Sequence, residues 1–211
     1  MENYSETKIK ICGLSRPSDI EYVNEAKPDY CGFIINFPKS IRNVSPETVS
    51  ELVKELSPDI TPVGVFVNEP HETILKLIAQ GTITHIQLHG QEDGAYIREL
   101  RERADREIMI IKAWKVRKTE DVKAAQESPA DLVLLDNGTG TGQTFDWSLI
   151  RGIDRPFLLA GGLSPENLAK AVSQVRPWGV DLSSGVETDG VKDRRKVLAA
   201  VRAVREFSLR G

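Results

Sequence analysis

Cysteine is scarce in this chain, which has only two among its 211 residues. Two cysteines in a chain of this length do not predict the disulfide framework that stabilises small secreted domains. The N-terminal stretch MENYSETKIK also lacks the apolar segment and the cleavage site of a secretory signal. We therefore expect a cytoplasmic protein whose thiols are reduced.

An excess of positive charge and long apolar runs are missing as well. Lysine and arginine total 28 against 31 acidic residues, which gives a net charge of −3 without a basic stripe. A nucleic-acid partner is therefore not expected. The longest apolar runs, such as LVLL and FLLA, are too short to cross a membrane. Apolar residues still make up 40% of the chain, which is enough to bury a full core.

What the sequence does contain is a regular alternation of short apolar runs and helical patterns. Most of the runs are continuous rather than alternating, which is typical of strands covered on both faces. Between them, apolar residues recur at helical spacing, as at Val49, Leu52, Val53 and Leu56. The eight runs span residues 8–12, 30–35, 61–67, 84–88, 107–114, 131–136, 156–160 and 178–182.

Eight strands alternating with helices predict right-handed βαβ units and, by their number, a closed (β/α)₈ TIM barrel. Ser45-Pro46 and Ser164-Pro165 each predict a helix N-cap followed by proline at the first helical position. An open doubly wound sheet would usually carry a glycine-rich loop after its first strand, where CGLSRP has one glycine. We expect one domain over residues 1–211, with residues 1–7 as a short flexible extension.

In such a barrel the active site lies at the C-terminal ends of the strands. Gly161 and Gly162 follow the seventh run, while Ser183, Ser184 and Gly185 follow the eighth. Backbone N–H groups in such loops, beside a helix N-terminus, suit a phosphate dianion. Glycines can also serve only a tight turn, but two matching loops at adjacent strand ends favour phosphate binding.

Cys12 ends the first run and Asp136 ends the sixth, on different sides of the barrel mouth. A thiolate is a competent general base, and a carboxylic acid with a raised pKa is a competent general acid. Each residue also has a structural reading, as a small buried apolar group for Cys12 and as a loop cap for Asp136. Cys31 opens the second run, so we expect it at the opposite end of the barrel, beyond disulfide reach of Cys12 and in the core.

Further candidates stand near other strand ends. Arg42 could clamp a carboxylate with its forked donors, although it could equally be a solvated charge. Gln87 and His89 lie at the tip of the fourth run, and Asp181 lies at the tip of the eighth. We expect these residues to face the ligand, although His89 could equally serve as a capping residue.

Two other features do not predict a nucleotide or metal site. GTGTGQT (138–144) has neither the GK[ST] ending of a P-loop nor the GxGxxG pattern, so we interpret it as a mobile loop over the mouth or as a plain connection. His71 and His85 stand at element starts away from the mouth and are expected to be structural. The three histidines have no carboxylate at ligand spacing, so no metal site is expected.

Taken together, the motifs resemble the phosphoribosylanthranilate isomerase family of tryptophan biosynthesis, over about residues 8 to 206. The motifs that carry the resemblance, in chain order, are KICGLSRPSD, PKSIRNVSPE, VGVFVN, IQLHGQE, LLD followed by GTGQTFDW, LAGGLSPENL and VDLSSGVE.

The resemblance implies a (β/α)₈ barrel that converts N-(5-phosphoribosyl)anthranilate to 1-(2-carboxyphenylamino)-1-deoxyribulose 5-phosphate, an Amadori rearrangement, without a cofactor. It implies Cys12 as general base, Asp136 as general acid and Arg42 as the partner of the anthranilate carboxylate. It also implies that the glycines and serines of the last two loops hold the phosphate. A monomer and a homodimer are both open.

The chain departs from the family pattern at three places. Ile41 stands where proline often precedes the arginine, Asn36 stands where an aromatic or small residue is expected, and the segment after Asp136 is short. These differences concern the shape of the anthranilate pocket. Two alternatives remain: a sister phosphosugar isomerase, which in histidine biosynthesis uses aspartate in place of Cys12, and a non-catalytic phosphosugar-binding barrel. A second, related isomerase activity is also left open.

Overall fold

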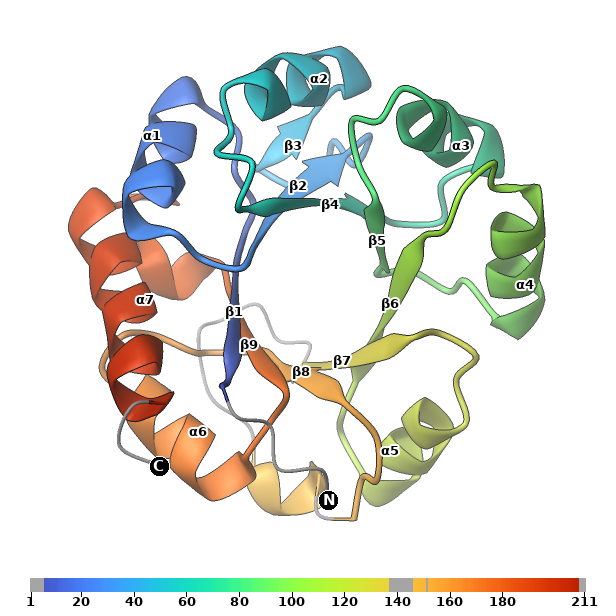
Figure 1. Ribbon diagram of the computed structural model, residues 1–211. Helices are drawn as coiled ribbons and strands as arrows, with labels where there is room; N and C mark the ends of the chain where they lie inside the picture. The colour runs from blue at the N-terminus through green and yellow to red at the C-terminus, as the bar shows by residue number, and fades with distance from the viewer. Residues whose placement is uncertain (1–5, 137–145, 151, 209–211) are drawn as a thin grey trace.

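The computed structural model describes residues 6–136, 146–150 and 152–208, and the chain folds there as a closed parallel barrel. Figure 1 shows the strands as a ring with the helices around its outside. Each barrel strand pairs in parallel with the next, and the first pairs with the last, which closes the ring. The predicted fold class is confirmed.

The barrel strands agree with the eight predicted runs to within one or two residues at each end. They are β1 (Lys8–Cys12), β2 (Tyr30–Ile35), β4 (Thr61–Phe66), β5 (His85–Leu88), β6 (Met109–Lys115), β7 (Leu132–Asp136), β8 (Phe157–Leu159) and β9 (Gly179–Leu182). Three strands of two residues lie at the rim. These are β3 (Asn43–Val44), which pairs with β2, and the antiparallel hairpin of β10 (Glu187–Thr188) and β11 (Val191–Lys192).

The helices pack outside the strands and bury their apolar faces against them. They are α1 (Pro17–Ala26), α2 (Pro46–Lys54), α3 (His71–Ala79), α4 (Gly94–Arg103), α5 (Thr119–Gln126), α6 (Leu168–Val175) and α7 (Arg194–Ser208), with 3₁₀ turns η1 (Trp147–Ile150) and η2 (Ser184–Val186). Among the described residues, no helix is both long enough and apolar enough to cross a membrane.

One of the two predicted helix caps is confirmed and the other is wrong. The Ser45 hydroxyl accepts a hydrogen bond from the Thr48 N–H at 3.2 Å, and Pro46 begins α2. After Ser164, by contrast, the chain makes a further turn, and α6 begins only at Leu168 with Asn167 as its N-cap. The Asn167 side chain holds that turn, since it accepts from Ser164 N–H at 2.9 Å and donates to the Gly162 carbonyl at 2.8 Å.

Alternation along each strand divides the core into two layers. Residues that point outward, such as Ile9 and Ile11 of β1, join the large apolar cluster under the helices. The inner face holds a smaller cluster, formed by Val63, Ile111, Leu132, Leu134, Leu158 and Ala160. Lys10 and Cys12 alternate with Ile9 and Ile11, and therefore face the barrel interior.

The register of β1 and β2 corrects the expected position of Cys31. Cys12 pairs with Gly32 and Ile11 pairs with Cys31, so the two cysteines are nearly level and not at opposite ends of the barrel. Both thiols are free because Cys31 points outward into the helix layer while Cys12 points inward. The expectation that Cys31 is a core residue is confirmed, since it is fully buried.

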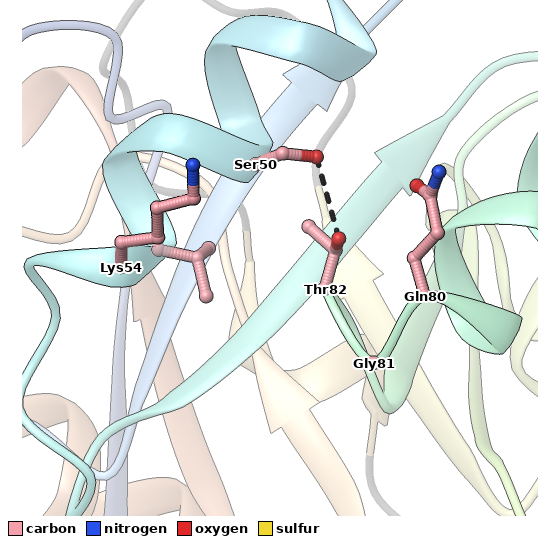
Figure 2. A pocket seen from close by; sticks show the side chains of 6 residues that line it. Ser50, Lys54, Gln80, Gly81 and Thr82 are labelled. Atoms are coloured by element: carbon pink, nitrogen blue, oxygen red, sulfur yellow. Dashed lines mark hydrogen bonds between the residues drawn. The ribbon is translucent and has the colours of Figure 1, made fainter.

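A shallow pocket lies on the outside of the barrel between α2 and the turn after α3 (Figure 2). Ser50 and Thr82 approach each other across it, with 3.3 Å between their hydroxyl oxygens, and Lys54, Gln80 and Gly81 complete its labelled lining. The turn at Gln80 to Thr82 precedes β5, so this pocket lies toward the N-terminal end of the strands. It is therefore distinct from the rim where barrel chemistry takes place.

Candidate active site

Cys12 lies at the C-terminal end of β1 and faces the barrel interior, with 6% of its surface exposed. Lys10 precedes it by two residues on the same face and is fully buried. The Lys10 Nζ atom donates to Asp181 Oδ1 at 2.9 Å, and the register of β1 and β9 places these two residues side by side. A thiol, an ammonium and a carboxylate therefore share one corner of the interior.

Gly32 makes room for this arrangement. A Cβ atom at position 32 would stand 2.8 Å from Cys12 Sγ and 2.9 Å from Lys10 Nζ, closer than real contacts allow. The absence of a side chain on β2 thus lets the ammonium and the thiol occupy adjoining space. Burial raises the pKa of the Cys12 thiol above its ordinary value, while the charge of Lys10 acts in the opposite direction.

Asp136 ends β7, which lies three strands away from β1 around the ring through β9 and β8. Its backbone carbonyl accepts from the Val116 N–H at 2.7 Å, which anchors the strand end. The carboxylate is partly buried, and its charge acts on the ring of His89. The structure thus places the two predicted acid–base residues at separate strand ends on one rim.

His89 and Gln87 form a pair at the end of β5. Gln87 Nε2 lies 3.1 Å from His89 Nδ1, and with the amide as donor the proton of the neutral ring lies on Nε2. Burial lowers the pKa of His89, although the charges of Asp136 and Asp181 oppose this shift. Gln87 is 1% exposed, and its Oε1 atom has no hydrogen-bond partner among the described residues. A buried oxygen of this kind is suited to accept a hydrogen bond from a bound ligand.

Arg42 lies at the same rim, but its forked donors are bound within the protein. Nε donates to Glu187 Oε1 at 2.7 Å, and Nη2 donates to Oε2 of the same carboxylate at 2.5 Å. The Arg42 side chain passes over Gly13, where an added Cβ would lie 2.4 Å from Arg42 Cδ. Gly13 also has a φ of +85°, so both its backbone and its surroundings favour glycine beside Cys12.

Glu187 joins two cations at this rim. Besides Arg42, its carboxylate accepts from Lys192 Nζ at 2.5 Å. Burial alone would raise the pKa of Glu187, but Arg42 and Lys192 lower it overall, so Glu187 is a carboxylate at neutral pH. Lys192 also donates to the Ser183 carbonyl at 3.2 Å, which ties this cluster to the loop after β9.

The loops after β8 and β9 lie against each other, as phosphate binding requires. Gly161 and Gly162 have φ values of +88° and +66°, in the left-handed region that favours glycine. A Cβ on Gly185 would stand only 1.8 Å from the Leu163 carbonyl oxygen, so the two loops touch at this glycine. Ser183 lies nearby, since its Oγ would be 3.3 Å from a Cβ on Gly13. Ser184 begins the 3₁₀ turn η2.

The structure accounts for two of the departures from the family pattern. Asn36 has a φ of +54°, a conformation that asparagine tolerates better than an aromatic residue, and its amide donates to Glu69 Oε1 at 2.9 Å. Ile41 is 77% exposed and reaches toward the turn of the β10–β11 hairpin at Gly190. The short segment after Asp136 and the GTGTGQT stretch lie outside the described residues.

The two remaining histidines each pack against a tyrosine ring. His71 begins α3, where its ring packs against Tyr96 with centroids 4.0 Å apart. His85 begins β5 and lies 5.5 Å from the ring of Tyr30. Within the part of the chain that the structure describes, no three histidine, cysteine or acidic residues are grouped to hold a metal ion.

Sequence reasoning missed three residues of this rim: Lys10, Glu187 and Lys192. The sequence did contain a signal for Lys10: it precedes Cys12 by two residues, and a strand places residues at that spacing on the same face. Glu187 ends the motif VDLSSGVE, but nothing in the sequence indicated its pairing with Arg42, and Lys192 had no signal, since both lie on a hairpin outside the barrel.

The fold and the rim together define a (β/α)₈-barrel protein equipped for acid–base chemistry. A family model described as N-(5'phosphoribosyl)anthranilate (PRA) isomerase matches residues 9–203. The N-(5'-phosphoribosyl)anthranilate isomerase of Acetivibrio thermocellus is 43% identical over 212 residues, which covers 95% of this chain and 96% of the relative. That of Endomicrobium trichonymphae is 42% identical over 205 residues, which covers 95% and 99%.

Solved structures agree with these relatives. Phosphoribosyl anthranilate isomerase from Thermotoga maritima superposes with a TM-score of 0.83 at 38% identity, covering 95% of this chain and 99% of that one. A phosphoribosyl anthranilate isomerase in complex with reduced 1-(o-carboxyphenylamino)-1-deoxyribulose 5-phosphate superposes with a TM-score of 0.81 at 38% identity, with the same coverage. The chain therefore belongs to the N-(5'-phosphoribosyl)anthranilate isomerase family.

Proposed function

We propose that this chain catalyses the Amadori rearrangement of N-(5-phosphoribosyl)anthranilate to 1-(2-carboxyphenylamino)-1-deoxyribulose 5-phosphate, in tryptophan biosynthesis, with Cys12 as general base and Asp136 as general acid. Membership of the family supports the reaction. The observation that carries the assignment of roles is the placing of one thiol and one carboxylate at separate strand ends on the same rim. A sister isomerase with aspartate at the first strand end does not fit Cys12.

The chemistry needs one proton delivered and one removed. Asp136 gives a proton to the ring oxygen of the ribosylamine as the bond from that oxygen to C1 breaks, which leaves an iminium group at C1. The iminium acidifies the proton on C2, and the Cys12 thiolate removes it. The resulting enolamine then tautomerises to the ketone. Proton exchange with solvent returns Cys12 and Asp136 to their starting states.

The loops after β8 and β9 supply orientation by holding the phosphate of the substrate. Gly161 and Gly162 have the left-handed backbone of a tight turn, and Gly185 of the loop with Ser183 and Ser184 touches the backbone of the next residue, Leu163. Binding the phosphate at one side of the rim fixes C1 and C2 of the sugar relative to Cys12 and Asp136. Such positioning can account for much of the rate enhancement.

The anthranilate end of the substrate is assigned to Arg42. Glu187 holds its guanidinium through Nε and Nη2, which leaves Nη1 as the donor for the substrate carboxylate. Gln87 and His89 are assigned to the substrate between the two ends, because a buried acceptor and a ring N–H are both available there.

Turnover measured by loss of anthranilate-riboside fluorescence tests the proposal. Purified protein should consume the substrate without added metal or cofactor. Tight binding of phosphate ligands without turnover would instead support a non-catalytic binding barrel. The similar structures include generated monomers of the dimeric phosphoribosylanthranilate isomerase of Thermotoga maritima, and light scattering would decide between monomer and homodimer here. A cytoplasmic location stays a prediction.

A further inference from the structure

The proposed mechanism needs a thiolate at a position where burial favours the neutral thiol. Cys12 is 6% exposed, and removal from water raises the pKa of a thiol. A buried cysteine without a compensating charge is an inert apolar residue. A neighbouring positive charge must therefore favour the ionised form.

Lys10 has the geometry to do this. A Cβ atom at Gly32 would lie 2.8 Å from Cys12 Sγ and 2.9 Å from Lys10 Nζ, so both groups crowd against this glycine. The distance between Cys12 Sγ and Lys10 Nζ is therefore at most about 6 Å, and no side chain of β2 lies between them. Over such a distance, a positive charge strongly favours the ionised form of a thiol. Both residues lie on the inner face of one strand, so the backbone fixes their relation.

We propose that Lys10 is a positioning residue that favours the thiolate form of Cys12 against the effect of burial, and that Asp181 keeps the Lys10 ammonium charged and beside the sulfur. The inference rests on the proposed function in taking Cys12 as the base. Burial alone would lower the pKa of Lys10, but the carboxylate of Asp181 at 2.9 Å raises it overall. Asp181, expected from the sequence to meet the ligand, thus acts through Lys10.

The other charges around Cys12 do not replace Lys10. Asp181 on β9 opposes thiolate formation, while Lys192 on β11 favours it. Arg42, on the loop after β2, also interacts electrostatically with Cys12. Both of these cations are ion-paired with the Glu187 carboxylate at 2.5 Å, which offsets their field at the sulfur. Cys31 points outward on the other side of the sheet.

The test is the pH dependence of Cys12 alkylation by iodoacetamide, resolved from Cys31 by peptide mass. In Lys10→Met the titration should move to higher pH by about one to three units, which lowers the alkylation rate at neutral pH by tenfold or more. The acidic limb of kcat/KM should move in the same direction. If Lys10→Met folds and its Cys12 alkylation has the same pH midpoint as the wild type, the inference is overturned.

Two further variants keep the test decisive. Gly32→Ala adds a methyl group 2.8 Å from Cys12 Sγ and 2.9 Å from Lys10 Nζ, so these groups must move apart from it without any change of charge, and it should also raise the titration midpoint. If Lys10→Met does not fold, an unchanged midpoint in Gly32→Ala overturns the inference. Lys112→Met is the matched control, because Lys112 is another buried lysine, paired with Glu92 at 3.0 Å, that does not act on Cys12. Its Cys12 titration should equal that of the wild type.

Alkylation is measured without substrate, so it tests the role of Lys10 independently of turnover, which tests the proposed function. Undiminished turnover in Cys12→Ser would remove the base from the proposed function even if Lys10 governs the thiol. An unshifted titration in Lys10→Met, with turnover that still depends on Cys12, would remove only the role of Lys10.

Discussion

Replacing Gly185 by alanine is expected to push the loops after β8 and β9 apart. The new Cβ would stand 1.8 Å from the Leu163 carbonyl oxygen and 3.1 Å from Ser164 Cα, and both of these are backbone atoms that cannot swing away. Restoring an ordinary contact of about 3.2 Å requires the loops to separate by more than 1 Å. Gly185 has no positive φ, so the effect arises from this contact and not from backbone strain.

A displacement of this size should reduce activity more than stability. Overpacking costs about 1 to 3 kcal/mol, which lowers the Tm of a chain of this length by several degrees. Misplacing a bound substrate by about 1 Å can lower kcat/KM by roughly 100-fold. We therefore expect Gly185→Ala to remain folded at 25 °C, with a loss of that order in kcat/KM and weaker competition by inorganic phosphate.

The assay is steady-state turnover with inorganic phosphate as a competitive inhibitor, accompanied by thermal unfolding. Gly94→Ala is the matched control, because an added Cβ at the start of α4 would meet the flexible end of Arg98 at 3.2 Å and Pro129 at 3.4 Å, neither of which belongs to the loops after β8 and β9. The control should keep wild-type kcat/KM. Normal kcat/KM and normal phosphate inhibition in Gly185→Ala would refute the assignment of these loops to the phosphate.

Three other outcomes are expected. Cys12→Ser and Asp136→Asn should each lower kcat by about 10² to 10⁴ while circular dichroism and phosphate inhibition stay normal, and near-normal kcat would remove the residue from the mechanism. Arg42→Ala should raise KM for the substrate more than Ki for inorganic phosphate, and a change in Tm alone would make Arg42 a structural residue. The pKa of Glu187 is lowered in the folded state, so its contribution to stability is present above its unfolded pKa of about 4.3 and is lost as pH falls through the folded value. Glu187→Gln should therefore lose less stability than wild type in urea unfolding between neutral and acidic pH, and equal losses would contradict the ion-pair assignment.

The barrel was predictable because its signals are local. Continuous apolar runs such as LVLL identify strands covered on both faces, and their number selects the closed fold. The rule that chemistry lies at strand C-termini then brings Cys12, Asp136 and the glycine loops to one rim without knowledge of any contact. These residues could be nominated from their order in the chain alone.

Properties that depend on pairing between strands were not predictable in the same way. The register that places Cys31 beside Ile11 is set by the stagger of the closed barrel, and nothing within β2 encodes it. The delayed start of α6 depends on Asn167 bonding back to the Gly162 carbonyl, which competes with a cap at Ser164. The partner of Arg42 comes from a hairpin more than a hundred residues later.

The two buried lysines show why Lys10 calls for a functional explanation. Lys112 donates to Glu92, to the Gly90 carbonyl at 2.8 Å and to the Leu88 carbonyl at 3.3 Å, so its three N–H groups hold the loop after β5. Such bonds offset the loss of hydration, which otherwise makes a buried ion pair a poor source of stability. Lys10 stabilises no loop in this manner. It donates to Asp181 and faces the sulfur of Cys12, so its burial inside the barrel is best explained by the charge it keeps beside the proposed base.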